Sequence, residues 1–421
     1  MTEVSINGVR HKPAAGSQSD GISSDRLRTI IQDSHLNFLI GAGTPSAFFG
    51  LLGNVEDALT QVAEATADDD VKAIVRASIQ AYFFDSVLTP NLKVVDRHAD
   101  AEEVLTSYAK FLRAVNRILL KRHSSILAKQ ANIFTTNVDM VFEVAFEQMG
   151  IDFSDGFSGK IRPRFDLGDF NTLRFRLASR FEQRSEVPVF NLVKIHGSAG
   201  WLQERRSAEK TEIIFDHGLS LITQTQTALN GARGDLIAIH DKDEVGAAAL
   251  IAKASSGAVP STVTAFSETY EKLGIVNPDK QKFATTVLNE TYYELIRRFA
   301  NELEKENSVL FVHGFSFRDE HLCDVVVRAA RSNPTLQVIV FCYSRGDLAS
   351  YQKLIPQTDV KNSNILFVLP PEPQDGAQEV KATLDVVTSD YLAPIIADKF
   401  PSADQRIELD IRLPSEGGTG V

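Results

Sequence analysis

Four segments of the chain carry the small or polar residues that hold nucleotides or perform acid–base chemistry, and each follows a short apolar run. In chain order they are Gly41-Ala42-Gly43-Thr44-Pro45-Ser46, Thr135-Thr136-Asn137-Val138-Asp139, His196-Gly197-Ser198 and Gly314-Phe315-Ser316-Phe317-Arg318-Asp319. Open α/β sheets bind their ligands at the carboxyl ends of the strands. We therefore expect the four segments to meet at one edge of a sheet.

The first segment has the residues of a phosphate-binding turn. Gly41 and Gly43 would let the backbone approach a pyrophosphate, and the hydroxyls of Thr44 and Ser46 would add donors to the backbone amides. A tight strand-to-helix turn with Pro45 at the first helical position explains the same residues. Both interpretations remain open for this segment.

The second and third segments carry the side chains with the most chemical potential. Asn137 and Asp139 follow a strand, where they suit a ligand site or an Asx turn and helix cap equally. His196 stands at the end of the next strand, and a histidine can act as a general base near neutral pH. Most lone histidines are structural, so His196 gains weight only from its neighbours.

The fourth segment combines Gly314, which would let the backbone approach a ligand closely, with Ser316, which could contact a phosphate or a ribose. Asp319 suits the N-cap of the following helix. Four separate structural explanations would have to coincide for none of these segments to bind a ligand. Their combination indicates a nucleotide site.

Six short apolar runs would position these segments, and strands that are apolar throughout are typical of parallel sheets covered on both faces. They span His35–Ile40, Asn132–Thr136, Val189–Ile195, Ser308–Val312, Gln337–Tyr343 and Ile365–Leu369. Helical periodicity is found in Asn54–Tyr82, Ala101–Leu127, Thr285–Lys305 and Asp319–Arg331. The pattern predicts a Rossmann-like, doubly wound parallel sheet, with helical insertions that form a smaller second subdomain.

The expected organisation has three parts. Residues 1–22 are rich in Ser, Gly and Pro and predict a flexible N-terminal arm. Residues 23–370 form the main domain, with helical insertions at about 54–127 and 200–305. Residues 371–421 form a C-terminal extension that we expect to serve in assembly.

Composition narrows the classes of function. The formal net charge of −11 disfavours nucleic-acid binding, except weakly or indirectly. Basic residues in the stretch from Lys160 to Arg184 alternate with acidic ones, which favours a solvated helix face. The two cysteines, Cys323 and Cys342, fit a reducing cytoplasm, and no apolar stretch has the length of a signal peptide or a membrane span.

In order and spacing, the four segments resemble the motifs of the sirtuin family, over about residues 35–345. The resemblance implies that NAD is the ligand, that His196 is the catalytic base, and that Asn137 and Asp139 serve at the nicotinamide ribose. By the same resemblance, the pyrophosphate and adenosine contacts come from the two glycine-containing segments and the end of the second strand. These cofactor-binding residues are Gly41, Ala42, Gly43, Thr44, Ser46, Thr135, Gly314 and Ser316.

Three departures separate the chain from sirtuins that deacylate proteins. The two Cys-x-x-Cys pairs of their zinc ribbon are absent, so no zinc is expected. Ala47-Phe48-Phe49-Gly50 stands where they have Pro-Asp-Phe-Arg, and Thr136 stands where they have Gln. These features resemble sirtuin-like effectors of bacterial antiphage defence, which implies a homo-oligomer and a separate HerA-type hexameric ATPase as partner.

The sequence thus predicts a hydrolase that cleaves the nicotinamide–ribose bond of NAD. Three alternatives remain. A zinc-less NAD-dependent protein deacylase would release nicotinamide only with an acylated peptide. A non-catalytic nucleotide sensor would have no need of Asn137 and His196. A DNA-acting effector such as a nuclease, recruited by a translocase, would need a carboxylate and metal cluster or a basic groove.

Overall fold

The computed structural model describes residues 4–6, 9–10, 22, 24–50, 55–122, 127–179, 184–205, 211–241, 244–254, 257–276, 287–355, 360–372 and 378–397. Most of the predicted N-terminal arm, and the end of the predicted C-terminal extension from residue 398 onward, lie outside the described residues.

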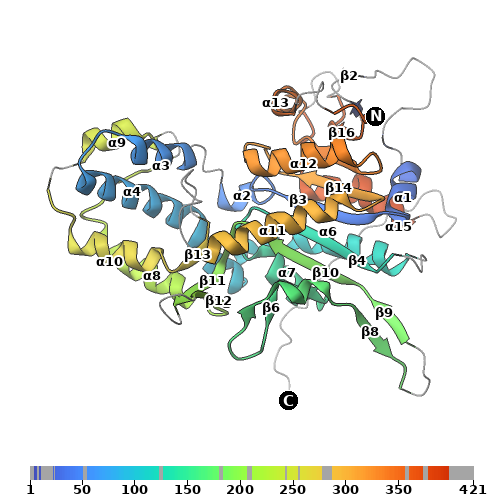
Figure 1. Cartoon of the computed structure of the whole chain (residues 1–421), viewed down its shortest axis with the longest axis horizontal. Coiled ribbons are helices and arrows are strands. Elements are labelled where there is room, and N and C mark those ends of the chain that lie inside the picture. The colour runs from blue at the N-terminus through green and yellow to red at the C-terminus, as the bar shows by residue number, and fades with distance from the viewer. Residues whose placement is uncertain are drawn as a thin grey trace.

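A central sheet with a parallel core carries the fold (Figure 1). Seven of its strands are parallel: β3 (His35–Ile40), β4 (Gln130–Thr135), β5 (Phe153–Ser154), β10 (Val189–Lys194), β14 (Ser308–His313), β15 (Gln337–Phe341) and β16 (Ile365–Val368). Their spatial order is β16-β15-β14-β3-β4-β10-β5. Apart from β5, this is the 3-2-1-4-5-6 order of the Rossmann fold.

All six strands predicted from apolar runs are present, and their ends differ from the prediction by at most two residues. Consecutive residues of β3 point to opposite faces of the sheet. Phe38 packs edge-on against Phe111, at 5.2 Å between ring centroids, whereas Leu39 belongs to the core on the other face. Both faces are therefore covered, which confirms the doubly wound architecture.

Helices from different parts of the chain cover the two faces. One face carries α11 (Val287–Glu304) and α12 (Glu320–Ser332). The other carries α6 (Glu102–Leu120), α7 (Val141–Met149) and α14 (Leu384–Val387). α13 (Asp347–Leu354) follows β15 in the chain. The predicted helices Thr285–Lys305 and Asp319–Arg331 correspond to α11 and α12, and Ala101–Leu127 ends earlier than expected, at Leu120.

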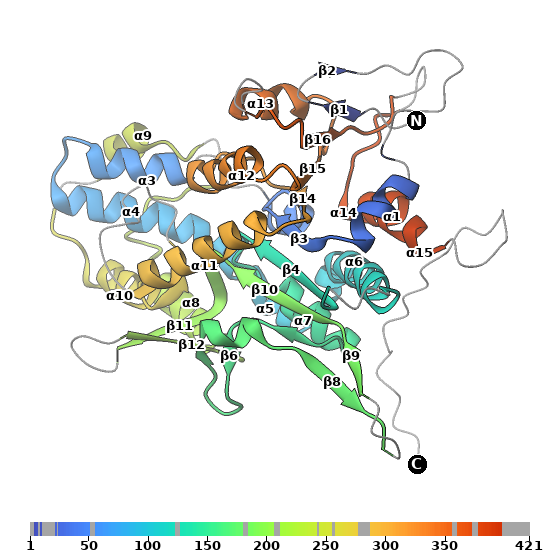
Figure 2. The same cartoon turned by 45° about the vertical axis from the view of Figure 1, so that its right-hand side comes forward.

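A smaller helical subdomain stands at one end of the sheet (Figures 1 and 2). It combines α3 (Val55–Glu64) and α4 (Asp69–Phe83) with α8 (Ser220–Ala232), α9 (Ala247–Lys253) and α10 (Ser261–Tyr270). The single helix expected over Asn54–Tyr82 is in fact two helices, because Asp68 caps α4 by accepting a hydrogen bond from the Asp70 amide at 3.0 Å. A π-helical turn, Phe84–Leu88, then leads to α5 (Pro90–Val95) and the 3₁₀ turn Ala99–Ala101.

A second sheet, which the sequence did not predict, lies beside the helical subdomain. Its order is β13-β11-β12-β7-β6, with β6 (Phe157–Ser158), β7 (Arg164–Phe165), β11 (Gly197–Arg205), β12 (Thr211–Phe215) and β13 (Leu273–Ile275). A 3₁₀ turn, Leu167–Asn171, leads to the separate hairpin of β8 (Arg174–Leu177) and β9 (Arg184–Val187), which projects from the body (Figure 2).

The helix face expected between Lys160 and Arg184 is therefore wrong. Where this segment is described, it forms strands and a 3₁₀ turn. Three of its basic side chains are in ion pairs: Arg164 with Glu212 at 3.5 Å, Arg174 with Asp152 at 2.7 Å, and Arg162 with Glu204.

Both ends of the described chain pack on the main domain. β1 (Val4–Ile6) pairs antiparallel with β16 and with β2 (Val9–Arg10), so part of the predicted arm extends the sheet. A π-helical turn (Thr388–Leu392) and α15 (Ala393–Ala397) follow α14, and they lie against α6 and α1 (Ser24–Gln32). No helix in the described ranges is both long and apolar enough to cross a membrane.

Candidate functional site

A pocket opens at the carboxyl ends of β3, β4 and β10, beneath the helical subdomain. Its cavity volume is about 180 Å³, and the cavity is open to solvent on one side. Its lining residues are Ala42, Pro45, Phe49, Gly50, Glu56, Phe83, Val87, Thr136, Asn137, Val138, Asp139, His196 and Val276. The structure thus brings together Ala42, Asn137, Asp139 and His196 from three of the four predicted segments.

Asn137 is held rigidly beside this pocket. Its backbone amide donates to the Thr135 hydroxyl at 3.0 Å, and its side-chain amide donates to the Gly41 carbonyl at 3.2 Å. Its carbonyl oxygen, Oδ1, is buried and makes no well-aligned hydrogen bond among the described residues, although the side-chain amide lies close to Tyr108 and Asp139. A buried acceptor without a partner is costly in a folded protein, so this atom is available to a ligand or a water.

His196 faces the same pocket and lies against a carboxylate. Its Nε2 atom is 3.1 Å from Oδ2 of Asp319, although Nε2 makes no well-aligned hydrogen bond. The His196 and Asp319 side chains are 17% and 16% exposed. Asp319 is also the N-cap of α12, as its sequence position predicts, because its other oxygen accepts from the Leu322 amide at 3.1 Å.

One more ionisable side chain, Tyr292, adjoins this pair. The ring of Tyr292 lies 5.8 Å from the imidazole of His196, measured between centroids. Burial, followed by the negative charges of Asp319 and Glu56, raises the pKa of Tyr292 well above its ordinary value. The Tyr292 phenol is therefore neutral at physiological pH and adjoins two carboxylates.

Helix α2 (Ser46–Phe49) and the helical subdomain together supply the apolar wall of the pocket. Phe49 comes from α2, and Phe83 and Val87 come from the end of α4 and the π-helical turn after it. π-helical turns are rare and frequently mark functional sites. The wall is therefore made where the subdomain joins the sheet.

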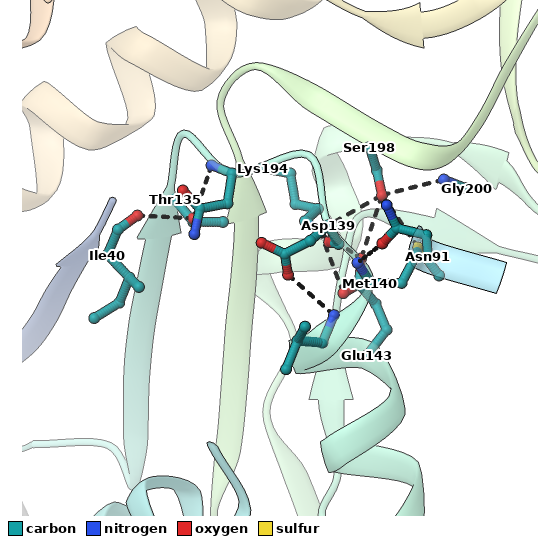
Figure 3. A network of polar contacts seen from close by, with 11 residues as sticks. Ile40, Asn91, Thr135, Asp139, Met140, Glu143, Lys194, Ser198 and Gly200 are labelled. Carbon is teal, nitrogen blue, oxygen red and sulfur yellow. Dashed lines mark hydrogen bonds and ion pairs between the residues drawn. The ribbon is translucent and has the colours of Figure 1, made fainter. Parts of the chain in front are cut away.

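Beneath the pocket, a buried ion pair joins the two loops that carry Asn137 and His196 (Figure 3). Lys194 lies 3.0 Å from Glu143, and its ammonium also donates to the Asp139 carbonyl. Ser198 is 3.5 Å from both Lys194 and Glu143, and the Met140 amide donates to Asn91 at 2.8 Å. The network fixes the spacing of the loops, because any displacement would leave buried charges unpaired.

Asp139 belongs partly to this framework. One of its oxygens accepts from the Val141 amide at 3.0 Å at the start of α7, which is the capping role that its position also suggests. Burial raises the pKa of Asp139, and the charge of Lys194 opposes the rise. Its carboxyl group still lines the pocket and remains a candidate to contact a ligand.

The glycine turn after β3 packs directly on the turn after β14. A Cβ atom on Gly43 would lie 2.9 Å from the Gly314 carbonyl oxygen, and one on Gly314 would lie 2.3 Å from the Thr44 hydroxyl. The amides of Gly41, Gly43 and Thr44 donate to His313, Gly314 and Gly41, respectively. Close packing of two backbones therefore accounts for these glycines, and three of the amides expected to face a pyrophosphate are occupied.

The hydroxyls of this turn are also engaged. The Thr44 hydroxyl lies 2.8 Å from Nδ1 of His313, and Nε2 of the same imidazole is 2.9 Å from the Ala382 carbonyl. The Ser46 hydroxyl donates to the Gly43 carbonyl at 2.9 Å. Burial lowers the pKa of His313 to about 4. We call Gly41, Gly43, Thr44, His313 and Gly314 the closed junction, and the region of Asn137, Asp139 and His196 the open end.

Besides the residues of the two glycine turns just described, two more predicted residues are not among those that line the pocket. Ser316 is exposed after β14 and is not among the lining residues. Thr135 is fully buried, and its hydroxyl donates to the Ile40 carbonyl at 2.8 Å and accepts from Asn137. The neighbouring Thr136 lines the pocket instead.

Sequence reasoning missed three contributors to the site: Asp319 as a partner of His196, Glu56, and Phe83. Asp319 carried a signal, since its segment was singled out, but its contact with His196 spans more than a hundred residues. Glu56 and Phe83 come from the helical insertion, whose periodicity predicts helices but not which helix end faces the sheet.

The chemistry available here is that of an acid–base pair beside a buried amide oxygen. The titratable lining residues are Glu56, Asp139 and His196, and no lysine or arginine lines the pocket in the described part of the chain. Two phenylalanines complete the wall. Within the described ranges, no group of three or more His, Cys, Asp or Glu side chains could hold a metal ion.

Compared with known proteins, the chain matches no family model and no curated protein. The likeness of its motifs to those of sirtuins therefore stays a prediction.

Proposed function

We propose that the chain binds NAD at the open end and hydrolyses its nicotinamide–ribose bond to give nicotinamide and ADP-ribose. The observation that carries the proposal is the convergence of Asn137 and His196 on one pocket at the carboxyl edge of a Rossmann-ordered sheet. The motif resemblance supplies the identity of the dinucleotide.

The character of the pocket suits the pyridinium half of NAD. The nicotinamide ring of NAD carries a positive charge, and the lining offers Glu56 and Asp139 as carboxylates. Phe49 and Phe83 offer aromatic surface, which attracts cations as well as flat rings. Without lysine or arginine in the described lining, this pocket is a poor place for the phosphates, which would lie toward Ala42 and the solvent.

The proposed reaction needs only groups that the pocket contains. As the C1′–N bond breaks, its electron pair passes to the ring nitrogen and nicotinamide leaves as a neutral molecule, while the ribose gains oxocarbenium character. A water then adds to C1′ and gives its proton to His196. Oδ1 of Asn137 orients this water or a ribose hydroxyl, and the apolar wall limits access of bulk water.

The test is nicotinamide release from NAD by the purified chain, compared with Asn137→Ala and His196→Ala. We expect each substitution to lower the rate by about a hundredfold or more. Asn230→Ala and His240→Ala, which change exposed residues of the helical subdomain, serve as matched controls and should retain full activity.

Two results would overturn the proposal. Release that occurs only with an acetylated peptide would identify a deacylase. Measurable NAD binding without release, under all conditions including added partner, would identify a nucleotide sensor.

The wider role that we propose rests on the motif resemblance alone. In that role, NAD cleavage depletes the cell of NAD in antiphage defence, in the cytoplasm, with a homo-oligomeric chain and a HerA-type hexameric ATPase as partner. Light scattering on a sizing column, with and without such an ATPase, tests the assembly. A monomer that does not bind the ATPase would contradict it.

A further inference from the structure

We propose that Asp319 is a positioning residue that orients the imidazole of His196 and stabilises its protonated form during the reaction. The catalytic role of Asp319 rests on the proposed function. The geometry of the pair, however, stands on contacts that do not depend on any substrate.

The two carboxylate oxygens of Asp319 make different contacts. Oδ1 caps α12 through the Leu322 amide, and Oδ2 lies 3.1 Å from Nε2 of His196. The N-terminus of a helix attracts negative charge, so the capping contact with α12 fixes the position of this carboxylate. The helix thus presents a fixed anion to the histidine.

The second observation is that the pair is enclosed. Both side chains are more than four-fifths buried, and Nε2 of His196 itself is inaccessible to solvent. A carboxylate repels the lone pair of an unprotonated nitrogen, so the proton of a neutral His196 is expected on Nε2. Nδ1 is then the nitrogen left to accept a proton from a water in the pocket.

The third observation concerns alignment. Nε2 and Oδ2 are 3.1 Å apart, yet they are not well aligned for a hydrogen bond. Catalytic hydrogen bonds are often poorly aligned before substrate binds and tighten in the complex. A small rotation of the ring as ribose binds would align the bond and place Nδ1 toward C1′.

In the proposed reaction, Asp319 moves no proton. His196 takes the proton of the attacking water at Nδ1 and becomes an imidazolium, whose charge Asp319 balances. The proton later leaves to solvent, so the overall reaction converts NAD and water into nicotinamide, ADP-ribose and a proton. Removing the carboxylate should therefore slow the chemical step and leave substrate binding largely intact.

The variants Asp319→Asn and Asp319→Ser test this assignment, because Asn and Ser cap helices about as well as Asp and should preserve α12. We expect kcat for nicotinamide release to fall by about a hundredfold, with the Kd for NAD changed by less than about threefold. Asp68→Asn, which alters the N-cap of α4 away from any histidine, is the control and should keep full activity.

A second readout does not need activity. In the protein labelled with ¹⁵N-histidine, the His196 signal, assigned by its loss in His196→Ala, should show the proton on Nε2 in the wild type. In Asp319→Asn the two tautomers should mix. A wild-type His196 with its proton on Nδ1, or an Asp319→Asn variant with unchanged kcat, would overturn the inference.

The two readouts also separate this inference from the proposed function. If the wild type releases no nicotinamide but His196 shows the Nε2 tautomer only when Asp319 is present, the pair stands and the NAD hydrolase proposal falls. If nicotinamide release depends on His196 but neither readout responds to Asp319, the hydrolase stands and the positioning role falls.

Discussion

The open end and the closed junction are neighbours on the same edge of the sheet, and both begin with residues typical of ligand sites. In the closed junction, polar groups bind one another: glycine amides meet carbonyls, and the Thr44 hydroxyl meets His313. In the open end, Oδ1 of Asn137 makes no well-aligned hydrogen bond among the described residues, and His196 faces a pocket.

Residue type alone therefore does not distinguish a ligand site from a packing site. A glycine turn is required wherever two backbones approach closely, whether the second backbone belongs to a ligand or to the protein. The open end differs because some of its hydrogen-bonding groups are not used within the fold. The buried ion pair of Lys194 and Glu143 beneath the pocket holds these groups in place.

The largest effect is expected from breaking the closed junction with Gly314→Ala. The new Cβ would lie 2.3 Å from the Thr44 hydroxyl, at a residue with φ of 64°. We expect the free energy of unfolding in urea to fall by about 4 kcal/mol. Gly150→Ala, at φ of 60° with no atom within 4 Å of its new Cβ, should cost only about 1 kcal/mol. Equal losses would show that the junction is not tightly packed.

Acid should weaken the closed junction next. The pKa of His313 is lowered to about 4 by burial, whereas an unfolded histidine titrates near 6.5. The unfolded state therefore binds the proton first, and the free energy of unfolding should fall as pH drops from 6.5 to 4, by about 3 kcal/mol. His313→Gln should flatten this part of the stability profile; an unchanged slope would contradict the buried neutral histidine.

Substitutions of two adjacent threonines, Thr135 and Thr136, test where the boundary between the two regions lies. Thr135→Val removes a buried hydroxyl that bonds Ile40 and Asn137, and should cost about 2 kcal/mol of stability in urea unfolding. Thr136→Val, in the pocket lining, should change stability by less than about 0.5 kcal/mol but weaken NAD binding in calorimetry. If Thr135→Val weakens NAD binding more than Thr136→Val does, the boundary is misplaced.

The smallest effect is expected from Glu56→Gln. Glu56 is exposed, so removing its charge should weaken NAD binding by about two- to fivefold, and less at high salt. Binding of NADH, whose dihydronicotinamide ring is uncharged, should not change. Glu64→Gln, at the far end of the same helix, is the control. An equal loss for NAD and NADH would argue against recognition of the pyridinium charge.

The parallel sheet was predictable because its strands are apolar on both faces and end in glycine or polar residues. Their spatial order was not, since apolar runs do not reveal which strand lies beside which. The second sheet was missed because strands such as Thr211–Phe215 mix charged and apolar residues. The same mixing led to the wrong helix over Lys160–Arg184, where strand pairing and tertiary ion pairs decide the structure.

The sequence allowed the position of the candidate site to be predicted, but not the contacts between its residues. Strand ends indicated Asn137 and His196, and both line the pocket. The hydrogen bonds from the Gly41 and Gly43 amides to His313 and Gly314 join residues far apart in the chain, and so does the contact of His196 with Asp319. Such pairings follow from tertiary packing, and local spacing carries no record of them.

The proposed reaction requires the nicotinamide ribose of NAD to bind at the open end. A crystal structure of His196→Ala, slowed in turnover and grown with NAD, tests it most directly. We expect the nicotinamide ring between Phe49 and Phe83, with C1′ of the ribose beside Asn137. A dinucleotide bound elsewhere on the chain, or no bound dinucleotide at saturating NAD, would contradict the claim.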